Sequence, residues 1–205
     1  MNLMAGRFRW VACQLEELQK CSKSIRTLQD TLERIPETLE KTYDQILMRV
    51  PEVDAVNAMK LLVWLTFGEE SFMLEDIARV VEINVNGNCL DTDGKLLYPH
   101  DVLRICSSLV TLMDDETVQL AHASVKEYML AKPRRIGSNA VVDPSKGHLL
   151  MSQFSLVYIL QVDALPSEDL IDYCANYWPK HVLASKEESA EIGRASCRER
   201  VSSPV

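Results

Sequence analysis

The feature that constrains this chain most is residues 102–132, where two strand-like runs stand between two helix-like segments. Residues 109–113, LVTLM, are apolar and partly β-branched, a composition that favours a strand. Three acidic residues at 114–116 interrupt this run, as turn residues do. Residues 117–121, TVQLA, alternate between polar and apolar side chains, which indicates a second strand. The two runs therefore predict a β-hairpin.

A helix is predicted directly after this hairpin. Ser124 is a suitable N-cap, and Glu127 three residues later completes a capping box. Val125, Tyr128 and Met129 recur at spacings that place them on one apolar face. Helix, hairpin and helix is the arrangement around the wing of a winged-helix domain. We therefore predict a mainly α fold, built on a winged-helix domain with helices and one β-hairpin, and carrying helical flanks.

Most of the remaining chain is also predicted to be helical. Only 7 of the 205 residues are glycine and 47% are hydrophobic, which suits packed helices. Pro36 is suited to the first turn of one helix, and Ser167 is a suitable cap for another. Apolar residues follow helical spacing in residues 8–21, 24–35, 36–51, 53–67, 74–83, 99–105, 148–162 and 167–178. The run 53–67 is so continuously apolar that we expect a buried central helix. Residues 84–94 predict a loop, and residues 133–147 predict a polar linker.

Charge and cysteine usage exclude several classes of protein. The net charge is −8, and a surface of that sign repels the phosphates of nucleic acid. Arg104 is the one long cation in the helix predicted at 99–105, whereas a DNA-reading helix carries several. The six cysteines form no CxxC pair, and no signal-like or membrane-spanning apolar segment is present. We expect a cytoplasmic protein that binds neither nucleic acid nor membrane.

No catalytic or metal-binding pattern emerges from the residues. The nearest approach to a phosphate-binding loop is residues 87–95, but six residues separate the glycines and Leu96 stands where Ser or Thr is needed. The acidic residues at 91–93 lack the distant glutamate of an EF-hand, so a solvated turn is the better interpretation. Ser107 and Ser108 lack a nucleophile elbow. We predict no enzyme activity and no metal.

Several stretches carry a resemblance to a known family. FRWVACQLEEL at 8–18, IPETLEKTYDQIL at 35–47, ICSSLV at 105–110 and VQLAHASVKEYM at 118–129 resemble the segment that follows the NACHT nucleotide-binding domain in fungal signal-transduction ATPases of the STAND class. IDYCANYWPKHV at 171–182 is similar to the helix that precedes the ankyrin or other repeats of that family. The resemblance implies an intramolecular switch in a larger ATPase that binds ADP and ATP, although this chain carries no cofactor of its own.

The resemblance also implies a division of the chain. Residues 1–35 correspond to the last helices of a truncated NACHT module, 36–135 to the winged helix, and 136–190 to a linker and helical connector towards a repeat array. Residues 191–201, EIGRASCRERV, resemble the translation of a common sequencing adapter, so we expect 191–205 to be an artefactual tail. The NACHT domain and the repeats would be the intramolecular partners, and other proteins could bind as well.

His122 is the candidate ligand-binding residue. In the wider STAND class, a histidine at the start of the helix after the wing contacts the β-phosphate of ADP, and His122 in LAHAS occupies the matching point. An imidazole N–H is a good donor to a phosphate oxygen. The alternative is a histidine that merely bonds a loop carbonyl at a helix start. An autonomous winged-helix adaptor that binds protein or DNA is the alternative function.

Overall fold

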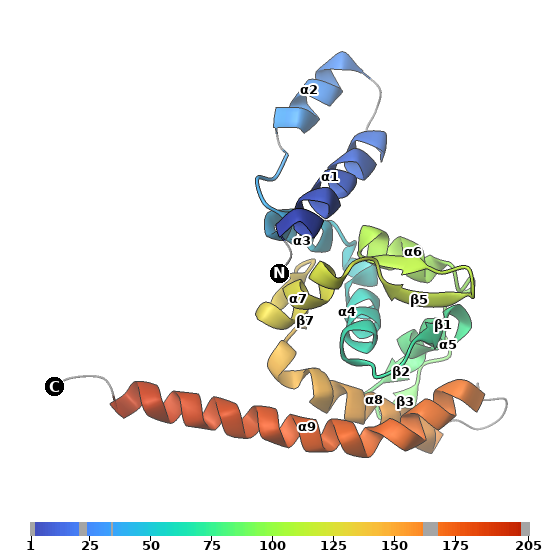
Figure 1. The fold of residues 1–205 in the computed structure, drawn as a ribbon. Coiled ribbons are helices and arrows are strands. Elements are labelled where there is room, and N and C mark those ends of the chain that lie inside the picture. The colour runs from blue at the N-terminus through green and yellow to red at the C-terminus, as the bar shows by residue number, and fades with distance from the viewer. Residues whose placement is uncertain (1–2, 21–23, 34, 162–167, 202–205) are drawn as a thin grey trace.

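The computed structural model describes residues 3–20, 24–33, 35–161 and 168–201. These residues form a mainly helical molecule with three small antiparallel sheets, as Figure 1 shows. The prediction of a mainly α fold is therefore confirmed. Within the described residues, no helix combines the length and the hydropathy needed to cross a bilayer.

The chain begins with three helices, which are α1 (Leu3–Lys20), α2 (Ile25–Glu33) and α3 (Leu39–Met48). The hydroxyl of Thr38 caps α3 by accepting a bond from the Lys41 backbone N–H at 3.2 Å. This side-chain cap satisfies a free backbone donor and starts the helix three residues after Pro36. The prediction that Pro36 lies in the first turn is therefore wrong. The predicted apolar face of α3 is confirmed, with Tyr43, Ile46 and Leu47 buried.

The apolar stripe of α1 faces solvent in this structure. Phe8, Val11 and Leu15 are 71%, 45% and 54% exposed. The opposite side of α1 contacts α3 and the residues before it. Trp10 Nε1 donates to the Pro36 carbonyl at 2.8 Å, and the Gln14 side-chain amide donates to the Thr42 hydroxyl on α3 at 3.0 Å. The helix is thus anchored through hydrogen bonds and leaves its most hydrophobic face uncovered.

The core is organised around α4 (Glu52–Phe67), which confirms the central helix expected from the continuous apolar run. Gly68 ends it, donating its N–H to the Trp64 carbonyl at 2.8 Å. Trp64 is fully buried and lies against Phe72 and Tyr173, with ring centroids 5.3 and 5.5 Å away. Because Tyr173 belongs to the last helix, one aromatic cluster joins the two ends of the core.

A three-stranded sheet covers one end of α4. The predicted hairpin is confirmed as β4 (Val110–Leu112) and β5 (Thr117–Leu120), with Leu112 opposite Val118. A further strand, β1 (Phe72–Met73), pairs with β5 and gives the order β1-β5-β4. Between β1 and β4 the chain forms α5 (Leu74–Arg79), the 3₁₀ turn η1 (Val80–Glu82), α6 (Asp101–Cys106) and the 3₁₀ turn η2 (Ser107–Leu109).

Two segments predicted to lack regular structure form hairpins instead. In residues 84–94, β3 (Cys89–Leu90) pairs with β2 (Ile83–Asn84), and the pair packs on a later helix, α8 (Gly147–Gln161). In the predicted linker, β6 (Arg134–Ile136) pairs with β7 (Ala140–Val142) and lies against α3 and α4. Alternate residues of β6 and β7 are buried, so this segment belongs to the core and is no linker.

Three helices complete the chain. They are α7 (Ala123–Ala131), α8 (Gly147–Gln161), which follows the 3₁₀ turn η3 (Pro144–Lys146), and α9 (Glu168–Val201). Helices α8 and α9 pack along one another, and α9 extends beyond the rest of the molecule (Figure 1). The predicted cap Ser167 lies outside the described residues. The helix α9 continues through 191–201, and the origin of that tail stays a prediction.

Candidate functional site

His122 itself caps helix α7. Its Nδ1 accepts the backbone N–H of Ser124 at 3.1 Å and lies 2.7 Å from the Ser124 hydroxyl oxygen. The predicted capping box is therefore wrong, because Ser124 is inside the helix rather than at its cap. Lys126 and Glu127 are exposed, so Glu127 lies on a solvated helix face. His122 is half-buried, and within the described part of the chain its Nε2 makes no hydrogen bond.

The hydroxyl of Ser124 continues this chain of bonds into the core. It lies 2.9 Å from the hydroxyl of Tyr43 on α3, and both side chains are buried. Arg9 of α1 bonds the Ser108 carbonyl and also reaches Tyr43. Burial raises the pKa of Tyr43, and hydrogen bonds from Ser124 and Arg9 oppose this effect. Three helices and the turn η2 thus meet next to the predicted site residue.

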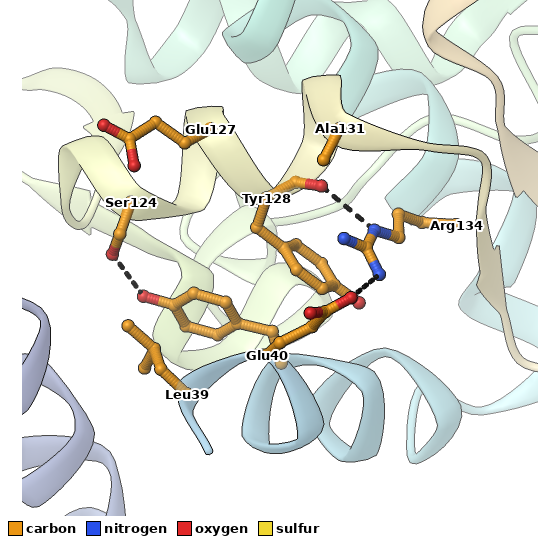
Figure 2. A pocket seen from close by; sticks show the side chains of 8 residues that line it. Leu39, Glu40, Ser124, Glu127, Tyr128, Ala131 and Arg134 are labelled. Carbon is orange, nitrogen blue, oxygen red and sulfur yellow. Dashed lines mark hydrogen bonds and ion pairs between the residues drawn. The ribbon is translucent and has the colours of Figure 1, made fainter. Parts of the chain in front are cut away.

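A second polar cluster surrounds a pocket between α3 and α7 (Figure 2). Arg134 of β6 is 3% exposed, and its Nε donates to the Tyr128 carbonyl at 3.0 Å. Its Nη1 donates to Glu40 at 3.0 Å and lies 3.4 Å from Asp44. The guanidinium also stacks over the Tyr128 ring, 3.6 Å from the centroid. The two carboxylates balance the charge of Arg134, and the ring face stacks on its guanidinium. Because these partners lie on α3 and α7, Arg134 joins both helices to β6.

The charge of this pocket disfavours an anion. Glu40 and Glu127 line it alongside Arg134, and Lys132 bonds Glu40 at 2.8 Å. The hydrogen bond from Lys132, followed by that from Arg134, lowers the pKa of Glu40, which therefore stays ionised near neutral pH. The volume of about 190 Å³ is below the 300–1,000 Å³ typical of ligand pockets. A nucleotide therefore does not fit here.

A pair of histidines, half-buried His148 and buried His181, joins α8 to α9. His148 Nδ1 lies 2.8 Å from His181 Nδ1, and the Tyr173 hydroxyl lies 3.1 Å from His181 Nε2. The backbone N–H of Glu69 donates to that hydroxyl at 3.2 Å, and the Glu69 carboxylate pairs with Lys180 at 2.7 Å. Burial, followed by the neighbouring His148, lowers the pKa of His181 to about 4. The pair is therefore neutral at physiological pH.

Outside these clusters, no group of chemically active side chains among the described residues forms a site. The described residues contain no set of three or more His, Cys, Asp or Glu that could hold a metal ion. Burial raises the pKa of the Cys106 thiol and that of the Cys174 thiol to about 12, so both are unreactive packing residues. The pair His100 and Asp101 lies at the exposed start of α6 and shows no bond between the two side chains.

Sequence reasoning located His122 but missed the residues around it. Arg134 was assigned to a linker. The GSN turn at 137–139 and the alternating burial on both sides of it are the signals of a hairpin. No local signal could have paired His148 with His181, because the two residues lie 33 positions apart. Tyr43 and Ser124 are 81 positions apart and were likewise beyond local patterns.

Comparison with curated proteins finds a distant relative, the "Azaphilone pigments biosynthesis cluster protein L" of Monascus ruber, which is 23% identical over 213 residues. The match covers 92% of this chain and 45% of the relative, so the chain spans about half the length of that protein. No family model and no solved structure matches the chain. At this identity the likeness establishes neither a family nor an activity.

Proposed function

We propose that this chain is the regulatory winged-helix segment of a NACHT-type signal-transduction ATPase, a switch and interaction module without catalysis of its own. The observation that carries the proposal is the position of His122. This residue follows the last strand of the three-stranded sheet and caps the next helix, with Nε2 left for an external acceptor. The resembled family places its phosphate-contacting histidine at the same point.

The topology supports the winged-helix assignment. Helix α4, strand β1, helices α5 and α6, and the β4–β5 hairpin follow one another in the order expected of a helix-turn-helix unit with a wing. The β2–β3 hairpin is inserted between α5 and α6. The wing strand β5 leads through Ala121 directly to the His122 cap. The histidine is therefore held by rigid elements on both sides.

In the proposed parent, ADP would be held mainly by the ATPase domain. The pocket beside α7 is too small and too acidic for a nucleotide, so this chain would contribute one donor from His122 to a phosphate oxygen. A segment that binds the ADP state better than the ATP state shifts the equilibrium between closed and open forms. The exposed stripe of α1 and the extended α9 are the surfaces we assign to the ATPase domain and to downstream repeats.

Two observations bear on the alternative function. Arg104 on α6 is engaged by Asp54 at 3.1 Å and Asp101 at 3.2 Å, so this helix lacks a cation available for DNA phosphates. The exposed Phe8 and Leu15 favour the other alternative, an adaptor that binds proteins. The relative comes from a fungus, in keeping with the fungal family that the sequence resembles. We assign the switch to the cytoplasm.

The first experiment is to sequence genomic DNA and transcript across both ends of this gene. We expect an in-frame NACHT module with a phosphate-binding loop upstream, and the loss of the adapter-like residues 191–201. In the full-length protein, His122→Ala should release bound ADP faster. His100→Ala, which changes an exposed histidine just before α6, should not. A complete gene that ends at both termini of this chain, or equal ADP retention in the two variants, would refute the proposal.

A further inference from the structure

We propose that Tyr43 and Ser124 are positioning residues that lock the His122 imidazole in the tautomer with its proton on Nε2. The fixed tautomer is a property of this chain alone, whereas donation from Nε2 to an ADP phosphate rests on the proposed function. A histidine in this tautomer offers a donor to solvent and can take only an acceptor as ligand, such as a phosphate or carboxylate oxygen.

The backbone of α7 determines one end of the bond chain. The Ser124 N–H donates to His122 Nδ1 at 3.1 Å, and a backbone N–H has no other role than donor. This bond favours a lone pair on His122 Nδ1, and so a proton on Nε2, but it is the longer of the two bonds to Nδ1. The Ser124 hydroxyl, 2.7 Å from the same Nδ1, can then only donate to it.

Tyr43 determines the other end. Once the Ser124 proton points at His122, the Ser124 oxygen is left to accept, and the Tyr43 hydroxyl 2.9 Å away donates to it. Arg9, which has donors only, supplies the hydrogen bond that the Tyr43 oxygen accepts. Burial raises the pKa of Tyr43, so its proton is present at neutral pH. Every proton in the chain from Arg9 to His122 thus has one position.

Burial makes this arrangement hard to replace. Tyr43 is 1% exposed and Ser124 is 6% exposed, so water has little access to either hydroxyl. If the hydrogen bonds ran in the opposite direction, from His122 to Ser124 to Tyr43, Nδ1 would carry a proton that faces the Ser124 N–H. That N–H would then be left unsatisfied at the first turn of α7. Such an orphaned buried donor is destabilising. The fold therefore selects the tautomer before any ligand binds.

The test is nitrogen-15 NMR of the His122 ring at pH 8, using the chain as it is and assigning the signals with His122→Gln. In the wild type, Nδ1 should resonate as an unprotonated ring nitrogen and Nε2 as a protonated one. Tyr43→Phe removes the donor to the Ser124 oxygen, so the Ser124 hydroxyl can turn and accept from Nδ1. Ser124→Ala leaves Nδ1 with only the longer backbone bond. Both variants should therefore move the Nδ1 signal towards the protonated position. Tyr128→Phe is the matched control. The Tyr128 ring lies against that of Tyr43, with the ring centroids 5.1 Å apart, but the Tyr128 hydroxyl donates to Asp44 and not to the Ser124 oxygen.

The outcomes separate this inference from the proposed function. A wild-type ring that averages both tautomers would overturn the lock. A locked ring that is unchanged in Tyr43→Phe and Ser124→Ala would show that the backbone alone sets the tautomer, and would overturn the positioning role. A confirmed lock together with normal ADP retention by His122→Ala in the longer protein would leave the inference standing while the proposed function fails.

Discussion

Lowering the pH from 8 to 5 should weaken the attachment of α9, because the His148–His181 pair is stable only when uncharged. The two Nδ1 atoms are 2.8 Å apart, and His181 is completely buried. One ring must donate and the other accept, so the pair can hold a single proton between these nitrogens. A second proton, placed on the accepting nitrogen, would set two N–H groups against each other and bury a charge among aromatic rings.

The magnitude follows from the pKa of His181. Its ordinary value is 6.5, and burial, then the neighbouring His148, lowers it to about 4 in the folded protein. A histidine whose folded pKa is depressed stabilises the fold above pH 6.5 and loses that contribution as the pH falls towards 4. The full difference corresponds to about 3 kcal/mol, and about 2 kcal/mol of it is lost between pH 8 and pH 5. Burial also lowers the pKa of His148, which adds loss of the same sign.

Charged neighbours do not reverse this sign. Glu69 favours protonation of both histidines, but Lys180 opposes it for both, and Lys126 opposes it for His148. The Tyr173 hydroxyl is uncharged, because burial raises its pKa and outweighs the opposing hydrogen bond from the Glu69 backbone N–H. Desolvation is the largest effect on each ring, so acid destabilises the pair.

The assay is urea unfolding, followed by circular dichroism at pH 8 and pH 5, of the wild type and His181→Gln. Carboxylates away from the pair whose pKa is shifted, such as Glu82, contribute to both proteins equally, so the difference between the two pH dependences reports the histidine pair. The wild type should lose about 2 kcal/mol more than the variant between the two pH values. His100→Gln, which removes an exposed histidine just before α6, should behave as wild type. Equal pH dependence of wild type and His181→Gln would refute the reasoning.

Three further substitutions test other parts of the structure. Gly147→Ala should destabilise the fold by about 1–3 kcal/mol in thermal or urea unfolding, because the new Cβ would lie 2.1 Å from Phe67. Adding Phe67→Leu should partly restore stability, and a Gly147→Ala variant with unchanged stability would contradict this packing. Arg134→Ala should cost about 2 kcal/mol in urea unfolding, whereas the exposed neighbour Arg135→Ala should cost under about 0.5 kcal/mol; similar losses would argue against the buried network. Leu15→Glu should reduce self-association in sedimentation velocity at unchanged stability, and a loss of stability would mean that the residue is buried.

Local patterns were sufficient for the elements whose signals lie within a few residues. The β4–β5 hairpin follows from a strand, an acidic turn and an alternating strand, and α4 follows from one continuous apolar run. Strand β1 was missed because two residues carry no periodicity, and it exists only through pairing with β5 more than 40 positions later. The β6–β7 hairpin was missed because buried Arg134 made its strand look polar.

The sequence predicted where the candidate site residue His122 lies in the chain, but not which residues bond it. His122 was identified through family resemblance, and the structure places it at the start of α7 as expected. Its role as the cap was not predicted, because serine is the preferred capping residue and Ser124 stood two positions on. Ser124 is unavailable for that role, since its hydroxyl bonds Tyr43 on a distant helix.

The sequence by itself determined the helices and the β4–β5 hairpin, because hydrophobic spacing and turn residues act over a few neighbouring positions. Its family resemblance, and not its local pattern, pointed to His122. The tertiary structure decided which polar groups meet. Arg134 with Glu40, Tyr43 with Ser124, and His148 with His181 are all joined across long separations in the chain. A buried polar group must find a partner wherever the fold provides one, and that requirement is met only after the helices have packed.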